Sequence, residues 1–262
     1  MNACDELEVY DCPDLEANVG DACTDSGGTA STIDANCTCT ETNILTDSRD
    51  GQTYPTVVIG NQRWMAKHLN VGTMLTLNIV SEIDGDCTGD SHPDNQTNNE
   101  VIEKYCFEND AANCETYGGL YQWNEAMNYA TTPGAQGICP NGWHIPTDDE
   151  WKELEMTLGM TQAEADGFND RGTDQGDQLK AAADCFGIAN CGTSGFNALF
   201  GGSTSPDGSF YTAGFYNYIW TSSTSSDDCY AWYRKFGYDS AQAGRADSFN
   251  KNNAYSCRCI QD

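Results

Sequence analysis

Oxygen-bearing side chains crowd together between residues 84 and 100, where they could hold a cation. Calcium prefers hard oxygen ligands in a flexible loop, so this stretch predicts a calcium site. The predicted ligands are Asp84, Asp86, Asp90 and Asp94. The spacing does not follow an EF-hand loop, and a solvated acidic loop is the alternative interpretation. A second, smaller acidic group consists of Asp170, Asp174 and Asp177.

Residues with catalytic potential are sparse. The three histidines, His68, His92 and His144, are not at metal-ligand spacing, and no His-Glu-x-x-His motif occurs. Residues 192–195, Gly-Thr-Ser-Gly, are one residue short of a nucleophile elbow, and there is no glycine-rich phosphate loop. We interpret His144 as a hydrogen-bonded structural histidine. We therefore expect no catalytic residues, no cofactor other than calcium, and a function that is not enzymatic.

The cysteines predict disulfide bonds. There are 14 of them, and no Cys-x-x-Cys pair of the kind that zinc ribbons use. An even, high count at these spacings is typical of a protein in an oxidising compartment, so we expect a secreted, extracellular or cell-surface protein. Cys106 and Cys114 would pin the acidic insertion, and Cys185 and Cys191 are close enough in sequence to bridge locally. The sequence alone does not give the connectivity, since six cysteines already allow 15 pairings.

The charge of the chain excludes several classes of partner. The 262 residues include 40 acidic and 12 basic ones, for a formal charge of −28. Such a charge repels nucleic acid and anionic membranes and favours divalent cations. No run of about 18 apolar residues is present, so we expect no membrane insertion. The first residues lack the basic start and apolar run of a signal peptide, and we expect a mature or trimmed product.

The elements that must position these groups are clearest over residues 139–159. Trp143 and Ile145 alternate as on a half-buried strand. Thr147 is a natural N-cap, and Glu150 three residues later completes a capping box, so a helix begins here. An apolar stripe at helical spacing follows, formed by Trp151, Leu154 and Leu158.

The remaining chain predicts a mixture of short helices and strands. A hinge over residues 43–50 precedes a β-hairpin over residues 54–65, where Gly60-Asn61 forms the turn. Further expected strands are 117–123, 215–222, 229–236 and 255–260, and expected short helices are 124–130 and 161–168. On the strand over 229–236, Tyr230, Trp232 and Arg234 would share one face. The expected fold class is α+β.

One long motif resembles a known family. Residues 139–151 read Cys-Pro-x-Gly-Trp-His-x-Pro-Thr-x-x-Glu-Trp, which is similar to the hallmark of the Fibrobacter succinogenes major paralogous domain, a family of bacterial secreted and surface proteins. Supporting matches lie, in order, at residues 50–54, 59–66, 117–123, 218–223 and 257–259. The resemblance covers about residues 46–262.

The resemblance implies a C-type lectin-like fold, with two short helices and a twisted antiparallel sheet. In that fold a disulfide ties the C-terminal strand to an early element, which here implies Cys139 with Cys257 or Cys259. Related proteins include sugar-binding lectins, adhesins and sulfatase-modifying enzymes. The reactive-cysteine pattern of those enzymes is not present here.

The N-terminal residues resemble a second, smaller unit. Residues 1–42 hold too few apolar side chains for a core, so disulfides must hold them together. They are similar to short cysteine repeats of secreted Bacteroidetes-type proteins, whose four cysteines match Cys12, Cys23, Cys37 and Cys39. We therefore predict a cysteine-rich module over residues 1–45 and a lectin-like domain over residues 46–262. Cys4 lies outside this set of four cysteines, and its role stays open.

Aromatic residues and modification motifs suggest contact with carbohydrate. Exposed rings could stack on sugars, although we expect most of them to lie in the core, because the chain has few aliphatic residues to fill it. The candidates are Tyr211, Tyr216, Tyr218, Tyr230, Trp232, Tyr233 and Tyr238. The Asp-Ser-Ala sequence at residues 239–241 resembles a Bacteroidetes O-glycan acceptor, which makes Ser240 a candidate glycosylation site.

Two functions follow from these observations. The first is a structural subunit that packs with other copies of itself into an extracellular fibre or matrix. The alternative is an adhesin that binds extracellular glycans through a calcium-assisted or aromatic site. The size of the protein in solution distinguishes them, since a fibre subunit forms ordered polymers and an adhesin stays monomeric.

Overall fold

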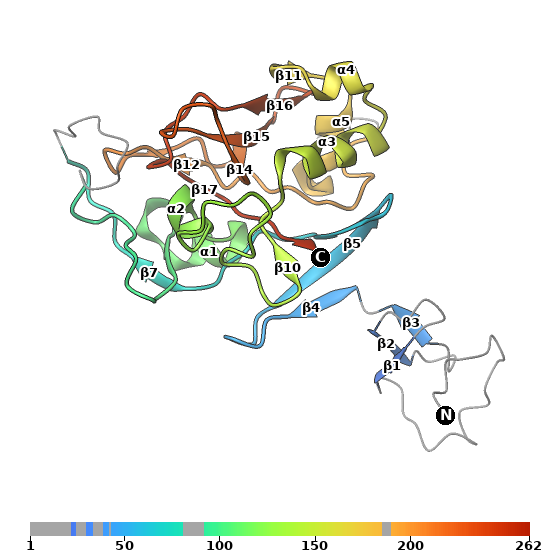
Figure 1. Cartoon of the computed structure of the whole chain (residues 1–262), viewed down its shortest axis with the longest axis horizontal. Coiled ribbons are helices and arrows are strands. Elements are labelled where there is room, and N and C mark those ends of the chain that lie inside the picture. Colours follow the sequence, from blue (N-terminus) through green and yellow to red (C-terminus); the bar gives the residue numbers. More distant parts are fainter. Residues whose placement is uncertain (1–21, 25–29, 34–38, 42, 81–91, 185–189) are drawn as a thin grey trace. The chain divides into compact units, whose positions relative to one another are not determined.

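The computed structural model of the chain describes residues 22–24, 30–33, 39–41, 43–80, 92–184 and 190–262 (Figure 1). The chain divides into two compact units, Met1–Leu45 and Thr46–Asp262. In the first unit, β1 (Ala22–Thr24), β2 (Ala30–Ile33) and β3 (Cys39–Glu41) form an antiparallel sheet in sequence order. The second unit contains the hallmark motif and all the side chains discussed below.

A five-stranded sheet joins strands that are far apart in the sequence. Its strand order is β10-β18-β6-β5-β4. The bounds are Ile44–Thr46 for β4, Thr53–Ile59 for β5, Gln62–Met65 for β6, Trp143–His144 for β10 and Ile260–Gln261 for β18. The hairpin between β5 and β6 is confirmed, and its turn uses Gly60 at φ +62°. Ile260 pairs with Trp64, so the last strand lies beside one of the first.

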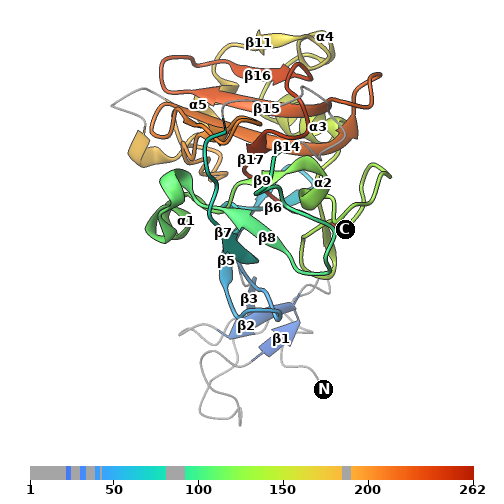
Figure 2. The ribbon, with the colours of Figure 1, turned by 90° about the vertical axis from the view of Figure 1, so that its left-hand side faces the viewer.

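A four-stranded antiparallel sheet has the order β11-β16-β15-β14. Its strands are β11 (Asn169–Arg171), β14 (Tyr216–Thr224), β15 (Ala231–Gly237) and β16 (Ala243–Ala246). The free edge of β14 bonds to Ser256, whose carbonyl accepts from Trp220 N at 3.2 Å. The strands therefore follow one another from β11 to β14 and on to β17 (Ala254–Tyr255) and β9 (Tyr121–Gln122) (Figure 2).

Two smaller sheets complete the strands of the described chain. One has the order β13-β12-β17-β9, and the other pairs β7 with β8 in parallel. Their bounds are Thr73–Leu75 for β7, Glu103–Tyr105 for β8, Tyr121–Gln122 for β9, Ser203–Thr204 for β12, Phe210–Tyr211 for β13 and Ala254–Tyr255 for β17. The strand predicted over 117–123 is therefore shorter than expected, because a helix extends to Tyr117 and two glycines follow it.

The helices are short. They are α1 (Ala111–Tyr117), α2 (Trp123–Ala126), α3 (Asp148–Thr157), α4 (Gln162–Ala165) and α5 (Gln175–Leu179), with 3-10 turns at Phe107–Asn109 and Ala182–Asp184. α2 ends earlier than predicted because Asn128 and Tyr129 adopt positive φ, at 47° and 60°. α4 also ends early, and Asn169 at φ 61° leads into β11 instead.

The predicted hallmark helix is confirmed as α3. Thr147 Oγ1 accepts from Glu150 N at 3.2 Å, and Glu150 Oε2 accepts from Thr147 N at 2.7 Å, which is a complete capping box. Trp151 and Leu154 are fully buried, so the apolar stripe faces inward as expected. No helix of the described residues combines the length and the apolar character that a membrane crossing requires.

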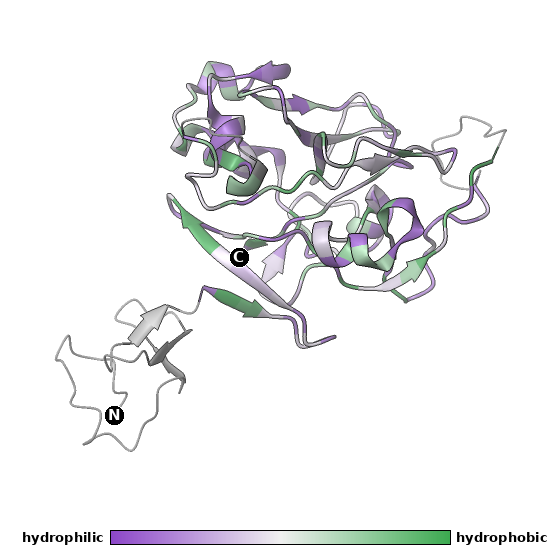
Figure 3. Cartoon of the chain, turned by 180° about the vertical axis from the view of Figure 1, so that it is seen from behind, coloured by the Kyte–Doolittle hydropathy of each residue, from purple (hydrophilic) through white to green (hydrophobic). Residues whose placement is uncertain are grey.

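α3 lies between the five-stranded and the four-stranded sheets (Figure 1), and aromatic rings fill the space. The Trp151 ring lies 5.0 Å from that of Trp64 on β6 and 5.4 Å from that of Phe196. Phe236 on β15 closes the other side of Trp151 at 6.3 Å. Hydropathy follows this arrangement, since β5 is coloured hydrophobic toward its end at Ile59 and the outlying β11 hydrophilic (Figure 3). The core therefore holds the hallmark helix against both sheets.

Two disulfides of the second unit agree with the predicted cysteines. Cys106 binds Cys114 across a sequence separation of 8 residues, and Cys139 binds Cys259 across 120. Cys191 is also disulfide-bonded, as predicted. Any bridges of Cys12, Cys37 and Cys185 lie outside the described residues, as do the side chains of Cys23 and Cys39. The α+β class is confirmed by the mixed helices and mainly antiparallel sheets.

Cys257, which was expected among the disulfide cysteines as the alternative partner of Cys139, is not bonded, because its thiol is free and fully buried. Cys259 directly precedes β18, which pairs with β10, and so it lies close to Cys139. The Cys257 carbonyl instead accepts from Leu69 N at 2.9 Å, farther from β10. Burial, with a smaller effect from the charge of Glu125, raises the pKa of the Cys257 thiol.

Candidate binding site

Three arginines on adjacent strands point toward α3 from one face of the four-stranded sheet. They are Arg171 on β11, Arg234 on β15 and Arg245 on β16, and Arg234 lies directly opposite Arg245. α3 presents Asp148 and Glu155, which are about two helical turns apart and therefore lie on one side of the helix. One helix thus supplies both carboxylates that meet the three cations.

Asp148 and Glu155 bind the arginines directly. Arg245 donates from Nε and Nη2 to the two carboxylate oxygens of Asp148, at 2.9 and 2.7 Å. Arg234 donates from Nη1 to Asp148 at 2.8 Å and from Nε to Glu155 at 2.7 Å. Arg171 completes the set with a hydrogen bond to Glu155. The five side chains are less than a tenth exposed, so removing one partner leaves a buried charge uncompensated.

Asp148 and Arg171 stay charged at neutral pH. Burial opposes ionisation of Asp148, but the bonds and charges of Arg245 and Arg234 outweigh it and hold the pKa of Asp148 far below its usual range. Burial lowers the pKa of Arg171 to about 10, which still leaves its guanidinium charged. Charge pairing therefore fixes the inner face of the sheet to α3.

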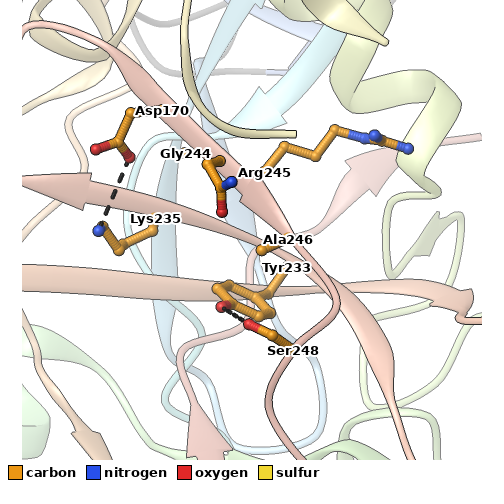
Figure 4. A pocket seen from close by; sticks show the side chains of 8 residues that line it. Asp170, Tyr233, Lys235, Gly244, Arg245, Ala246 and Ser248 are labelled. Carbon is orange, nitrogen blue, oxygen red and sulfur yellow. Dashed lines mark hydrogen bonds and ion pairs between the residues drawn. The ribbon is translucent and has the colours of Figure 1, made fainter. Parts of the chain in front are cut away.

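The outer face of the same sheet carries different residues, because side chains alternate along a strand. Tyr233 and Lys235 flank Arg234 and point outward, and Gly244 and Ala246 flank Arg245 in the same way. These outward positions form a pocket that we call the outer groove (Figure 4). Its lining residues are Asn169, Asp170, Tyr233, Lys235, Gly244, Arg245, Ala246 and Ser248.

Two polar pairs close the ends of the outer groove (Figure 4). At one end the Lys235 ammonium lies 3.8 Å from the Asp170 carboxylate. At the other end the hydroxyls of Tyr233 and Ser248 are 3.1 Å apart. Burial raises the pKa of Tyr233 to about 12, so its hydroxyl keeps its proton at neutral pH. The groove thus offers one cation, one anion and two hydroxyls.

Half-exposed aromatic rings continue the outer groove across β15 to β14. The Lys235 ammonium lies 5.3 Å from the Tyr216 ring, and Tyr216 and Tyr218 lie 6.4 Å apart on the same face of β14. Phe249, which is 44% exposed, contacts Tyr233 at 5.6 Å and Tyr218 at 6.3 Å. The face therefore combines a polar groove with neighbouring rings on which a flat ligand could stack.

The structure brings together only some of the predicted stacking residues. Tyr216, Tyr218 and Tyr233 share the outer face of the sheet. Trp232 lies on the opposite face, as its predicted alignment with Arg234 requires, and stacks on the Arg245 guanidinium at 3.7 Å. The other three candidates lie elsewhere: Tyr211 on β13, Tyr230 next to Asn250, and Tyr238 against Phe215.

Of the eight groove residues, only Tyr233 was identified from the sequence as part of a carbohydrate site, and the other seven were not. The sequence could have placed Lys235 on the same face as Tyr233, because Arg234 between them is expected on the other face. It could not have placed Gly244 and Asp170 there, because they reach the groove only through the pairing of β11 with β16.

The predicted calcium ligands fall mainly outside the described residues. This holds for Asp84, Asp86 and Asp90, whereas Asp94 accepts from the backbone and side-chain nitrogens of Asn78, at 3.0 and 2.9 Å. Within the described ranges no three acidic, histidine or cysteine side chains are placed to hold a metal. The calcium site at residues 84–94 stays a prediction.

The second acidic group does not converge on one point. Asp177 binds Lys180 Nζ at 2.7 Å, and Asp174 accepts from Asn190 at 3.2 Å. Asp170 faces Lys235 in the outer groove. Each carboxylate therefore has a different partner, and the three do not form a shared ion site.

The histidines take different structural roles. His144 Nε2 contacts Glu150 at 2.9 Å and Nδ1 contacts Asp262 at 2.7 Å, so the ring joins β10 to α3 and to the residue after β18. The bond to Glu150 is the main cause of the raised pKa of His144. His68 is fully buried near Arg258, and burial followed by that charge lowers its pKa. His92 contacts the Asn78 carbonyl at 2.8 Å.

Ser240 lies at the turn between β15 and β16. Its side chain is half-buried, and Oγ accepts from Gln242 N at 3.3 Å. Its carbonyl accepts from Lys180 Nζ at 2.8 Å, so the backbone is held in place. Glycosylation of Ser240 stays a prediction.

Comparison with known proteins adds one match. The profile described as the Fibrobacter succinogenes major domain matches residues 57–261. This range includes α3, the Cys106–Cys114 and Cys139–Cys259 disulfides and every residue of the outer groove. No curated protein and no solved structure matches the chain.

Proposed function

The chain belongs to the Fibrobacter succinogenes major domain family, and from this premise we propose that it is an exported, non-enzymatic module that binds carbohydrate on the outer face of its four-stranded sheet. The observation that carries the proposal is the outer groove with its neighbouring rings. Sugars present hydroxyls along their edges and C–H groups on their ring faces. A groove of charged and hydroxyl groups beside half-exposed Tyr216, Tyr218 and Phe249 matches both surfaces.

A rigid support under the groove favours binding. Arg234 and Arg245 alternate with the groove residues along the same strands, and their buried bonds to α3 fix those strands. A site on a fixed sheet loses little conformational freedom when a ligand binds, which favours affinity. The hallmark helix thereby acts on binding from the far side of the sheet.

The proposal extends to a C-type lectin-like fold. Two features of the second unit support it. β18 lies beside β6, so the last strand pairs with an early one. The disulfide from Cys139 to Cys259 also ties the residue before β18 to the segment that leads into β10.

Export is the third part of the proposal, and the disulfides support it. Cys106–Cys114 and Cys139–Cys259 would be reduced over time in a cytosol, whereas they persist outside the cell. An extracellular or cell-surface location would give a binding module access to extracellular glycans. Detection of the protein in the culture medium or at the surface of intact cells of the native host tests this part.

The test of binding is calorimetry of the full chain with soluble glycans, using two matched variants. Phe249→Ala removes a ring beside the groove, and Phe215→Ala removes an equally large, 53% exposed ring elsewhere. We expect at least tenfold weaker binding for Phe249→Ala and unchanged binding for Phe215→Ala. No binding to any glycan, or equal losses in both variants, would overturn the proposed site.

A second candidate function is a structural subunit that packs with copies of itself. The observation that favours it is the ring pair of Phe215 and Tyr238, 5.3 Å apart and 53% and 42% exposed. Exposed aromatic pairs are typical of protein contacts. Sedimentation of the purified protein tests it: polymers that Phe215→Ala disperses would support a fibre subunit, and a monomer at all concentrations would exclude it.

A further inference from the structure

We propose that the outer groove selects neutral sugars over acidic ones, and that Asp170 and Lys235 are the residues that determine this specificity. The inference rests on the proposed carbohydrate-binding function and names the class of ligand for that site. It follows from the geometry of one ion pair, from the position of the other cation among the lining residues, Arg245, and from the small side chains of the groove floor.

The ion pair of Asp170 and Lys235 is open to a third partner. Its nitrogen-to-oxygen distance is 3.8 Å, longer than the 2.7–3.2 Å of a hydrogen bond. Both groups are partly accessible, since Lys235 is 33% and Asp170 45% exposed. A sugar hydroxyl donates one hydrogen bond and accepts others, so it can donate to the carboxylate and accept from the ammonium at the same time.

Vicinal hydroxyls extend the same pattern. A neighbouring hydroxyl on the same ring can reach the other oxygen of Asp170, or another proton of Lys235. At the far end of the groove, the Tyr233 and Ser248 hydroxyls, 3.1 Å apart, can each both donate and accept. Uncharged polyols satisfy all of these groups without leaving a charge unpaired.

An acidic sugar meets unfavourable charges in the same place. Its carboxylate could bind Lys235, but it would also lie close to Asp170, which is held to that lysine. Arg245 cannot bind the sugar carboxylate, because its guanidinium lies on the other face of the sheet and binds Asp148 at 2.7 Å (Figure 4). The net charge of −28 adds a further repulsion of anions.

The floor of the groove leaves room for a ring. Gly244 and Ala246 occupy the outward positions of β16; Gly244 lies between Asp170 on β11 and Lys235 on β15, and Ala246 lies beside Tyr233. A Cβ atom on Gly244 would lie 3.1 Å from Asp170 Oδ1 and 3.1 Å from Lys235 Cβ. Any larger side chain at this position would therefore fill the space between the two charged groups.

The experiment compares matched neutral and anionic polysaccharides by affinity electrophoresis of the full chain. The pairs are hydroxyethyl cellulose with carboxymethyl cellulose, dextran with carboxymethyl dextran, and galactan with polygalacturonate. We expect at least tenfold tighter binding to the neutral member of the pair that binds. Equal or tighter binding to the anionic member would overturn the selectivity while leaving carbohydrate binding intact, and no binding to any of the six would overturn the proposed function as well.

Matched variants assign the selectivity to named residues. Asp170→Asn keeps the shape of the side chain and removes its charge, and Asp149→Asn makes the same change at an exposed position on α3. We expect Asp170→Asn to reduce the ratio of neutral to anionic affinity at least fivefold, and Asp149→Asn to leave the ratio unchanged. Equal ratios in the parent and both variants would overturn the assignment to Asp170.

A second pair of variants tests the cation and the floor. Lys235→Met should weaken neutral binding at least tenfold, whereas Lys67→Met, outside the sheet, should not change it. Gly244→Ala should not strain the backbone, because the φ of Gly244 is not in the left-handed region. It should weaken binding, because the added Cβ fills the groove. Full binding by both Lys235→Met and Gly244→Ala, with unchanged melting temperatures, would show that sugars bind elsewhere.

Discussion

At the scale of single residues, buried charges hold this domain together. Arg234 is fully buried and pairs with Asp148 and Glu155, so two carboxylates of one helix neutralise its buried charge. Such networks add little net stability compared with apolar packing, but they are costly to break. They also determine which face of a strand points inward, because a buried arginine cannot exchange places with Lys235 or Tyr233.

Asp148→Ala should therefore be strongly destabilising. The change leaves Arg234 and Arg245 buried without one of their acceptors, which costs about 3–5 kcal/mol of unfolding free energy. Asp149→Ala, at the adjacent and exposed position, should cost less than about 1 kcal/mol. Urea denaturation of both variants measures the difference, and similar losses would contradict a structural role for the network.

His144 should make stability depend on pH. Its pKa is raised chiefly by the bond to Glu150 and further by Asp262, so the folded protein binds the proton more tightly than the unfolded chain. The resulting stabilisation is complete below the unfolded pKa of about 6.5 and is lost as pH rises through the folded pKa.

The measurement compares the parent with His144→Gln by chemical denaturation at pH 5.5 and pH 9. The parent should exceed the variant by more at pH 5.5, and Asp262→Asn should reduce that difference by removing the negative charge of one partner of His144. A constant difference across this range would mean that His144 contributes through packing and neutral hydrogen bonds alone.

At the scale of elements, α3 is the helix on which both sheets depend. Its first turn holds Asp148 and its capping box, and its buried stripe contacts β6 and β15 through Trp151. A change at its N-terminus should therefore reach the outer groove through the strands that α3 fixes.

Thr147→Ala removes the cap of α3 and should lower the unfolding free energy by about 1 kcal/mol. Thr161→Ala breaks the same kind of capping box in α4, a four-residue helix whose capping bonds are exposed, and should cost less. Thermal unfolding of the two variants provides the comparison. A larger loss of stability at Thr161 would contradict the expectation that the cap of α3 contributes more to stability than the cap of α4.

At the scale of the whole molecule, the disulfides differ in the length of chain that they close. Cys139–Cys259 spans 120 residues and joins β18 to the start of the hallmark, whereas Cys106–Cys114 spans 8. The entropy of the unfolded chain is reduced more by the longer loop. The Cys139–Cys259 bridge should therefore contribute more to the stability of the second unit than the Cys106–Cys114 bridge does.

Replacing both cysteines of each bridge with serine tests this expectation. Loop entropy gives losses of about 5 kcal/mol for the Cys139–Cys259 pair and about 2.5 kcal/mol for the Cys106–Cys114 pair. Guanidinium denaturation of the two double variants measures both. Equal losses would mean that strain or local packing, and not loop length, sets the contribution of these bridges.

Local features of this protein could be predicted from its sequence alone. The capping box of Thr147 and Glu150, the hairpin turn at Gly60 and the inward stripe of Trp151 were all predicted, because each depends on neighbours within a few residues. The α+β class followed from the same short-range patterns. The choice between Cys257 and Cys259 stayed open, since two cysteines separated by one residue differ only in which strand each one meets.

The composition of the outer groove could be seen only in the tertiary structure. Asp170, Lys235 and Gly244 come from three strands, and the pairing of β11, β16 and β15 brings them together. Register sets which residues face one another across strands, and it depends on long-range contacts such as the bonds of Arg234 and Arg245 to α3. The outer groove lies on the opposite face of the sheet from that buried network. Because side chains alternate along each strand, the arginines that face α3 determine which of their neighbours line the groove.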